Sequence, residues 1–126
     1  MPSPNEKSGW ALVSATARKK TFPDSFEIPS LEKRSSLKRG DAAQLLFDIE
    51  TKEAGVVVDR GVDRMWVIVV DVLPDGYRGV LDSDPGVAEN LRLLRGDLIE
   101  FGADHICKID TPPEAFLKSE YGRYFQ

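Results

Sequence analysis

Apolar and polar residues alternate along most of this chain, which is the spacing of β-strands. In residues 43–50, Leu45, Phe47 and Ile49 fall on one face of an extended chain, and the other face is mostly acidic. This pattern predicts a half-buried strand. Residues 64–72 are apolar on both faces, as in a central strand that is covered on both sides.

Turn residues separate these strands. Residues 73–77 contain Pro-Asp-Gly, which predicts a hairpin with Asp75 and Gly76 at positive φ. Residues 77–81 then return antiparallel, with Gly79 as a candidate bulge. Residues 60–63 are interpreted as another turn, and residues 17–24 as a polar connection that ends in a turn. Further short strands are predicted at residues 10–13, 26–28, 56–58, 98–101 and 104–109.

Two helices are predicted. Ser30 is a suitable N-cap for a short helix over residues 31–37. The segment from Thr111 to Glu114 matches a capping box with proline at the first helical position, which predicts a helix over about residues 112–121. Its apolar residues continue into the aromatic end of the chain, and packing on the parent domain is the favoured interpretation.

Together these elements predict a mainly β (α+β) fold. We expect a small, bent antiparallel sheet or SH3-like half-barrel, with a short helix near 31–37 and a C-terminal helix. Residues 1–9 resemble a flexible terminus, and residues 10–126 are expected to form a single β-rich domain.

One turn pattern occurs twice. The sequences Leu-Lys-Arg-Gly-Asp at 37–41 and Leu-Leu-Arg-Gly-Asp at 93–97 are each followed by a predicted strand. Glycine supplies the left-handed conformation in such a turn, and aspartate bonds the local backbone. Because the flanking residues differ, we interpret the pair as the same turn chemistry used twice and not as a duplication.

Composition and charge exclude several classes of function. The chain has 126 residues, a net charge of −4 and a pI of about 5.0, so it lacks the basic character of a nucleic-acid-binding protein. Cys107 is the single cysteine, which favours a reducing compartment such as the cytoplasm. No apolar run is long enough to cross a bilayer, and a signal peptide is not apparent.

No cluster of residues has the spacing of a catalytic, cofactor or metal site. His105 and Cys107 would share a face of the last predicted strand, but two such ligands cannot complete a tetrahedral zinc shell without carboxylates. We expect His105 to be exposed and Cys107 to pack as a small apolar residue. The glycines do not form a phosphate-binding loop. The expectation is therefore no catalytic residue, no cofactor and no metal.

A series of short motifs extends over about two-thirds of the chain, in a fixed order. It comprises Phe26-Glu27-Ile28-Pro29, Leu37-Lys38-Arg39-Gly40-Asp41, Arg64-Met65-Trp66-Val67, Gly76, Gly79-Val80-Leu81, Asp84-Pro85, Gly96-Asp97, Phe101 and Ile106. With these motifs, residues 26–110 resemble a bacterial domain family of unknown function typified by YegJ-like proteins. Ser83 departs from the pattern, where an asparagine is expected. The resemblance implies a compact β domain and no particular reaction, and relatives of such families sometimes look like immunity proteins.

The leading hypothesis is a non-catalytic cytoplasmic protein-interaction module with a regulatory or immunity-like role and an unidentified protein partner. Trp66, Ile68 and Val70 are assigned to the core. The predicted binding face surrounds one hairpin end and comprises Arg64, Tyr77, Arg78, Asp82 and Asp84.

Two alternatives remain open. The first is a small-molecule or sugar-binding β-barrel with weak hydrolase activity through Asp82 or Asp84 and a pocket lined by Tyr77. The second is a structural homodimer, joined through the edge of residues 56–58 or through the aromatic C-terminal helix.

Overall fold

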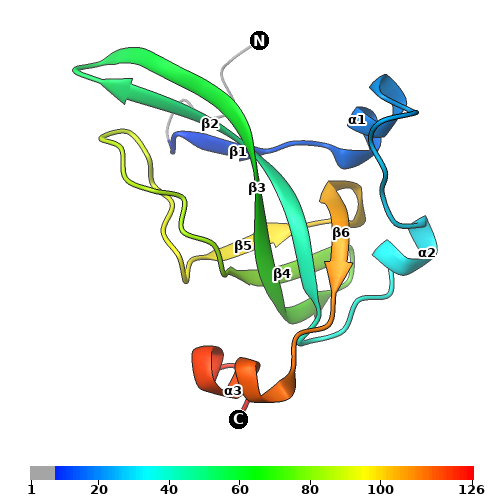
Figure 1. Cartoon of the computed structure of the whole chain (residues 1–126). Helices are drawn as coiled ribbons and strands as arrows, with labels where there is room; N and C mark the ends of the chain where they lie inside the picture. The colour runs from blue at the N-terminus through cyan, green and yellow to red at the C-terminus, as the bar shows by residue number, and fades with distance from the viewer. Residues whose placement is uncertain (1–7) are drawn as a thin grey trace.

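The computed structural model describes residues 8–126 and has a mainly β fold, as predicted. Six strands form one antiparallel, curled sheet (Figure 1). The strands are β1 (Trp10–Leu12), β2 (Ala42–Glu53), β3 (Val56–Leu73), β4 (Gly76–Leu81), β5 (Leu98–Phe101) and β6 (Ile106–Asp110). Their order is β1-β2-β3-β4-β5, and β6 shares the free edge of β2 with β1. The predicted half-barrel is confirmed.

Three α-helices and one 3-10 turn surround the sheet. They are α1 (Ala15–Thr21), α2 (Leu31–Arg34), η1 (Ala103–His105) and α3 (Glu114–Tyr121). Among residues 8–126, no helix has the length and apolar character needed to cross a membrane.

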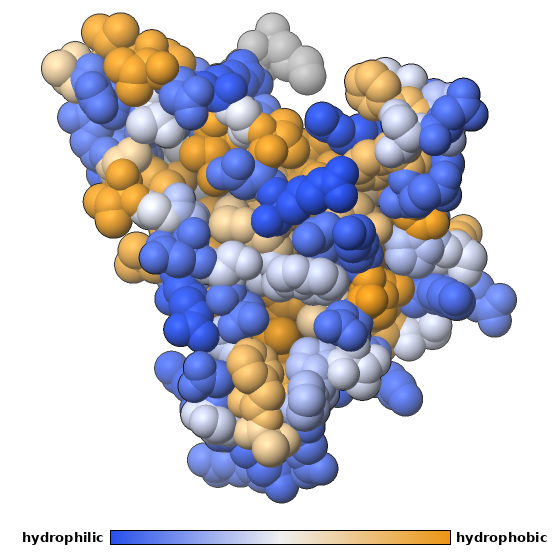
Figure 2. Space-filling view, viewed as in Figure 1, coloured by the Kyte–Doolittle hydropathy of each residue, from blue (hydrophilic) through white to orange (hydrophobic). Residues whose placement is uncertain are grey.

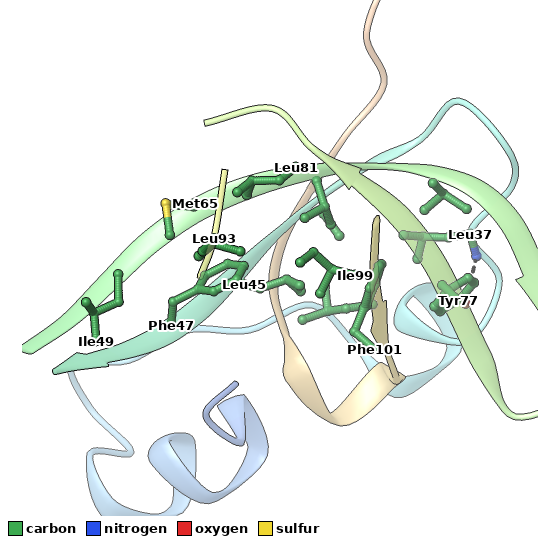
Figure 3. Close-up of a cluster of buried hydrophobic side chains, with 14 residues drawn as sticks. Leu37, Leu45, Phe47, Ile49, Met65, Tyr77, Leu81, Leu93, Ile99 and Phe101 are labelled. Atoms are coloured by element: carbon green, nitrogen blue, oxygen red, sulfur yellow. Dashed lines mark hydrogen bonds between the residues drawn. The ribbon is translucent and has the colours of Figure 1, made fainter. Parts of the chain in front are cut away.

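The inner face of the curled sheet carries the largest core. Side chains from β2 and β3 alternate into it, and Figure 3 shows them meeting side chains of β4 and β5. Its buried members are Leu37, Ala43, Leu45, Phe47, Ile49, Met65, Val67, Val69, Tyr77, Leu81, Leu93, Ile99, Phe101 and Ile106. This inner cluster explains why residues 64–72 are apolar on one face.

Two smaller clusters cover the outer face. One joins Ile68 and Val70 to Leu117 and Tyr121 of α3. The other includes Ala15, Phe26, Leu46 and Cys107. The prediction that the central strand is covered on both sides is confirmed, although Trp66 is only half-buried.

The two Arg-Gly-Asp turns adopt the same conformation. Gly40 and Gly96 have φ of 94° and 97°, and the following Asp41 and Asp97 each accept a hydrogen bond from the main-chain N–H three residues earlier, at 2.8 and 2.9 Å. Each turn also exchanges two main-chain hydrogen bonds of 2.8 Å with a residue of the sheet, the first turn with Val69 and the second with Leu81. The interpretation as one turn chemistry used twice is confirmed.

Several local predictions were wrong. Residues 60–63 are not a turn, because β3 continues through them, paired with β2. Residues 15–21 form α1 instead of a polar connection, with Ser14 as its N-cap. Residues 26–28 are not a strand; Phe26 packs instead into an outer cluster. The last strand begins at Ile106, because residues 103–105 form η1.

The helix ends also differ from the prediction. Ser30 caps α2 as expected, but the helix stops at Arg34, and Leu37 enters the inner cluster. The predicted capping box of α3 does not form: the helix starts at Glu114, with Pro113 as N-cap and no side-chain cap. Proline has no N–H, so Pro112 and Pro113, which precede Glu114, cannot donate the main-chain hydrogen bond that a capping box needs.

Glycine acts through close packing at the β3–β4 hairpin. Gly76 has no positive φ and pairs with Leu73. A Cβ there would lie 2.5 Å from the carbonyl oxygen of Phe101. The predicted bulge occurs on the strand opposite Gly79, where the register shifts between Val69 and Asp71. Val69 and Val70 are both buried, Val69 in the inner cluster and Val70 in an outer one.

The first described residues are hydrogen-bonded to the rest of the domain. Ser8 and Gly9, which were assigned to the flexible terminus, accept main-chain hydrogen bonds from Arg92 and Glu50; residues 1–7 lie outside the described part.

Arg34 is buried and donates to the carbonyl oxygens of Pro29 and Ala103, both at 2.9 Å. This arginine joins α2 to η1.

The repeated turns give a matched test of backbone strain. In Gly40→Ala and Gly96→Ala, the new side chain sits at positive φ, which costs about 1–2 kcal/mol of unfolding free energy. A Cβ at Gly40 also meets Leu117 Cδ1 at 3.1 Å, whereas none of the described atoms lies within 4 Å at Gly96. We expect Gly40→Ala to be the more destabilising in urea unfolding.

Gly61→Ala is the control, because Gly61 lies in a strand without positive φ and its Cβ meets nothing within 4 Å. It should leave stability unchanged or raise it slightly. Equal unfolding free energies for all three variants would contradict the strain at the two turns.

Candidate functional site

The five residues of the predicted binding face do not gather at one hairpin end. Tyr77 and Arg78 pair with Val72 and Asp71, next to the β3–β4 turn. The other three lie at the opposite end of the hairpin, where Asp82 donates its main-chain N–H to Trp66 O at 2.9 Å. The prediction failed because β3 and β4 are long enough to separate the two groups by several residue pairs.

Tyr77 belongs to the core. Its side chain is 3% exposed, and its ring lies 5.4 Å from that of Phe101. The hydroxyl donates to Arg34 O at 2.8 Å and accepts from Leu37 N at 3.2 Å, the contact that is dashed in Figure 3. The assignment of Tyr77 to a binding face was therefore wrong, and a sugar pocket that joins Tyr77 to Asp82 or Asp84 is not formed.

Arg78 and Asp84 have surface roles that require no ligand. Arg78 forms ion pairs with Asp71 at 3.0 Å and Glu100 at 3.8 Å. Asp84 Oδ1 accepts the Gly86 N–H at 2.9 Å and so stabilises its own turn. Neither residue lines the clefts described next.

Trp66 occupies the centre of an open groove on the outer face of the sheet. Two adjoining clefts, of about 270 and 380 Å³, share Trp66 and Asp110 as lining residues. We call the pair the Trp66 groove. Its further lining residues are Glu27, Ile28, Pro29, Ala42, Ile68, Asp82, Cys107, Lys108, Ile109, Pro112, Pro113 and Phe116.

The strands and their flanks build this groove. Trp66 pairs with Gln44 of β2, which in turn pairs with Lys108 of β6, so three strands form the floor. One side is formed by residues 112–116 at the start of α3, and the other by residues 27–29. Segments from both halves of the chain are therefore needed to make it concave.

Ser83 fixes the main chain of Trp66. Its hydroxyl accepts the Trp66 N–H at 3.0 Å, beside the Asp82 N–H to Trp66 O bond. Ser83 is also the position where the sequence departs from the YegJ-like pattern. The Ser83 side chain thus bonds across to the neighbouring strand, β3.

Three carboxylates and one cation line the groove: Glu27, Asp82 and Asp110, with Lys108. Glu27 already pairs with Lys19 and Asp82 with Arg95, both at 3.4 Å. Asp110 is exposed, and its Oδ1 accepts the N–H of Thr111 at 2.8 Å. Carboxylates beside an aromatic face attract cations, because the ring quadrupole and the negative charge act in the same sense.

Asp82 also connects α3 to the sheet. Tyr121 donates its hydroxyl to Asp82 Oδ1, and Arg95 approaches the same oxygen at 3.4 Å. Burial, together with this hydrogen bond to Asp82, raises the pKa of Tyr121 to about 12. The Tyr121 phenol therefore stays protonated well above neutral pH and keeps α3 in place beside the groove.

His105 and Cys107 do not act together. Gly102, which precedes η1, donates its N–H to His105 Nδ1 at 3.0 Å, and burial lowers the pKa of the imidazole. Cys107 lies in β6 and donates to Gln44 O at 3.1 Å, and burial raises the pKa of its thiol. His105 is half-buried and not exposed as expected. Within residues 8–126, no group of three or more potential ligands is placed to hold a metal ion.

Sequence reasoning missed the groove residues Trp66, Asp110 and Phe116. Trp66 was assigned wholly to the core, because it alternates with Ile68 and Val70, which are buried. The residue type was the available signal. Trp66 stands in a run of valines and isoleucine, and its indole leaves an aromatic surface where β3 passes Asp110, the last residue of β6. The pairing that joins these strands is not visible in a local pattern.

No protein-family model matches the chain, and comparison with curated proteins and with solved structures also gives no match.

The raised pKa of Tyr121 predicts a specific alkaline destabilisation. An unfolded tyrosine ionises near pH 10, so the extra stability is fully present below about pH 10 and is lost as the pH rises toward the folded value of about 12. Tyr121→Phe should remove this part of the pH dependence. It should also cost about 2 kcal/mol at neutral pH, because the phenol donates to a carboxylate.

Urea unfolding at several pH values between 8 and 12 measures both effects. Tyr124→Phe is the matched control, because it removes a neighbouring hydroxyl and leaves the Tyr121–Asp82 bond in place. If the two variants lose stability in parallel over this range, the role assigned to Tyr121 is wrong.

Cys107 should be an unreactive thiol in the folded protein. Its side chain is buried, and a raised pKa keeps it protonated at neutral pH. We expect alkylation by iodoacetamide to be slow in buffer and to become fast in urea, when followed by mass spectrometry. Rapid modification of the folded protein would show that the thiol is accessible as a nucleophile.

Proposed function

We propose that this protein is a non-catalytic interaction module that binds a basic segment of a partner protein in the Trp66 groove. The observation that carries the proposal is the exposed part of Trp66 between Asp82 and Asp110 in an open cleft. An arginine or lysine side chain stacked on the indole would have the exposed Asp110 carboxylate within reach, whereas Asp82 already pairs with Arg95. Binding of a cation by an aromatic ring requires no catalytic residue.

The shape of the groove favours a peptide segment over a small molecule. Its two clefts adjoin along the outer face, from α3 across Trp66 to residues 27–29. An elongated, open surface of this kind suits an extended chain, whereas small-molecule sites are usually more enclosed. Arginine, tryptophan and tyrosine dominate the energetics of such contacts.

The regulatory or immunity-like role and the membership of residues 26–110 in a YegJ-like family remain predictions. A cytoplasmic location agrees with one buried thiol and an acidic chain. In this proposal the protein acts by occupying a basic surface of its partner. Its net charge of −4 would speed the encounter with that partner.

Charge reversal at Asp110 is the direct test. Asp110 is exposed, so Asp110→Lys should leave the fold intact and reverse the charge at the centre of the groove. A fluorescein-labelled Gly-Arg-Gly-Arg-Gly peptide is the probe, and anisotropy measures its affinity. We expect Asp110→Lys to weaken binding about tenfold or more, and added salt to weaken binding to the wild type.

Asp75→Lys is the matched control, because it makes the same charge change at an exposed position in the β3–β4 turn, which does not line the groove. Trp66→Leu should weaken binding as well, since it keeps an apolar side chain but removes the indole face. Equal affinities for the wild type, Asp110→Lys and Asp75→Lys, or no binding at all, would contradict the proposed site.

A further inference from the structure

The β2–β3 hairpin extends beyond the rest of the sheet and ends in an open edge (Figure 1). β3 pairs with β2 along nearly its whole length, but its pairing with β4 begins only at Val67. Within residues 8–126, no strand pairs with the other edge of residues 56–65. Along this edge, N–H and C=O groups are directed away from β2 and are available to another strand. We call this segment the β3 edge.

The β3 edge is more apolar than an exposed strand needs to be. Val56, Val57 and Val58 are 63%, 47% and 52% exposed, and Val62 is 37% exposed. Figure 2 shows the corresponding apolar surface at the tip of the hairpin. The segment contains no proline, although proline is a common guard against edge pairing. A two-stranded hairpin gains stability when a third strand is added.

The charges of the β3 edge are divided between its two faces. Asp59 and Asp63 flank Gly61 on one face, where all three line a cleft of about 250 Å³ against residues 85–88. The other face of the strand carries two guanidinium groups: Arg60 forms an ion pair with Asp48 of β2 at 2.9 Å, and the Arg64 guanidinium lies 5.4 Å from the ring centre of Phe26. Within the edge strand itself, carboxylates therefore lie on one face and guanidinium groups on the other, and Arg60 already has an acidic neighbour in β2.

This division disfavours pairing of the edge with a second copy. A symmetric antiparallel pair has its twofold axis perpendicular to the sheet, so residues directly opposite share a face and one residue faces itself. If the axis passes through Asp59, Arg60, Asp63 or Arg64, that residue meets its own charge.

The two remaining positions of the twofold axis, at Gly61 and Val62, also bring like charges together. An axis at Gly61 sets Asp59 opposite Asp63, and one at Val62 sets Arg60 opposite Arg64. Like charges directly opposite are destabilising. Every symmetric register centred on residues 59–64 contains such a pair. A register centred on Val57 or Val58 brings no like charges together, but it leaves residues 61–65 of the edge without a partner.

We infer that the β3 edge binds an extended segment of a different protein as an added antiparallel strand. The segment that fits it has lysine or arginine opposite Asp59 and Asp63, and glutamate or aspartate opposite Arg60 and Arg64. Small apolar residues fit opposite the valines and Gly61. Main-chain hydrogen bonds supply affinity in this mode of recognition, and the alternating side chains supply specificity. This surface is separate from the Trp66 groove and does not depend on the function proposed for it.

Two synthetic peptides of identical composition test the inference. The matched peptide, Glu-Lys-Val-Val-Glu-Lys-Val-Val, runs antiparallel with its first residue opposite Arg64 and its last opposite Val57. In the exchanged peptide, every glutamate and lysine trade places, so each charge meets its like. Fluorescence anisotropy of the labelled peptides should give about tenfold or more tighter binding for the matched peptide.

Amide hydrogen exchange, followed by NMR, locates the bound strand. Addition of the matched peptide should slow exchange within residues 57–64 and leave the rest of β3 unchanged. The double variant Asp59→Lys with Asp63→Lys should lose most of the preference for the matched peptide. Asp24→Lys with Asp75→Lys makes the same charge change at exposed positions elsewhere and should retain it.

Three results would overturn the inference. Equal affinity for the two peptides would mean that the charges do not select a strand. Binding of neither peptide would mean that the charges only protect the edge against pairing. A dimer in sedimentation equilibrium that protects the same amides would mean that a second copy is the natural occupant.

Discussion

The pairing of β2 with β3 is the interaction on which the rest of the structure depends. Both strands are apolar on two faces in their central parts, so neither can leave one side in water. A shift of one residue would exchange the inner side chains of Leu45 and Phe47 with those of Leu46 and Asp48. Once this register is set, β4 and β5 enclose the inner face and the helices cover the outer one. The Trp66 groove and the β3 edge both lie where β4, β5 and the helices no longer cover the sheet.

Alternation predicted the fold because most strands obey it. The central strands, the β3–β4 hairpin and the repeated turn could all be deduced from spacing, since each depends on interactions between near neighbours. The errors occurred where distant partners override a local signal. Residues 60–63 contain the composition of a turn, but hydrogen bonds to β2 hold them extended. Tyr77 resembles a surface residue until its hydroxyl is seen to bond Arg34 and Leu37, about forty positions earlier.

The candidate site was less predictable than the fold, for a physical reason. A groove consists of the space between elements, and the Trp66 groove needs residues 27–29, the end of β6 and the start of α3 to come together. Asp82 was singled out from the sequence, and it does line the groove. Arg64 and Asp84 lie near this end of the hairpin without lining it. A list of polar residues on one hairpin cannot distinguish these cases, because each side chain is already engaged by a different neighbour: Phe26 for Arg64, Tyr121 for Asp82 and Gly86 for Asp84.

The position of β6 has a consequence for biosynthesis. Residues 42–45 of β2 pair with β3 on one side, and on the other side they acquire a partner only when Ile106–Asp110 has been made. A ribosome that has released β2, β3 and β4 therefore presents a nascent sheet with that edge of β2 unpaired and without α3 over Ile68 and Val70. Because segments fold in the order of synthesis, closure must wait until β6 and α3 have been made. Premature termination before β6 and α3 would thus yield a product with an exposed strand and apolar face, a natural substrate for chaperones and proteases.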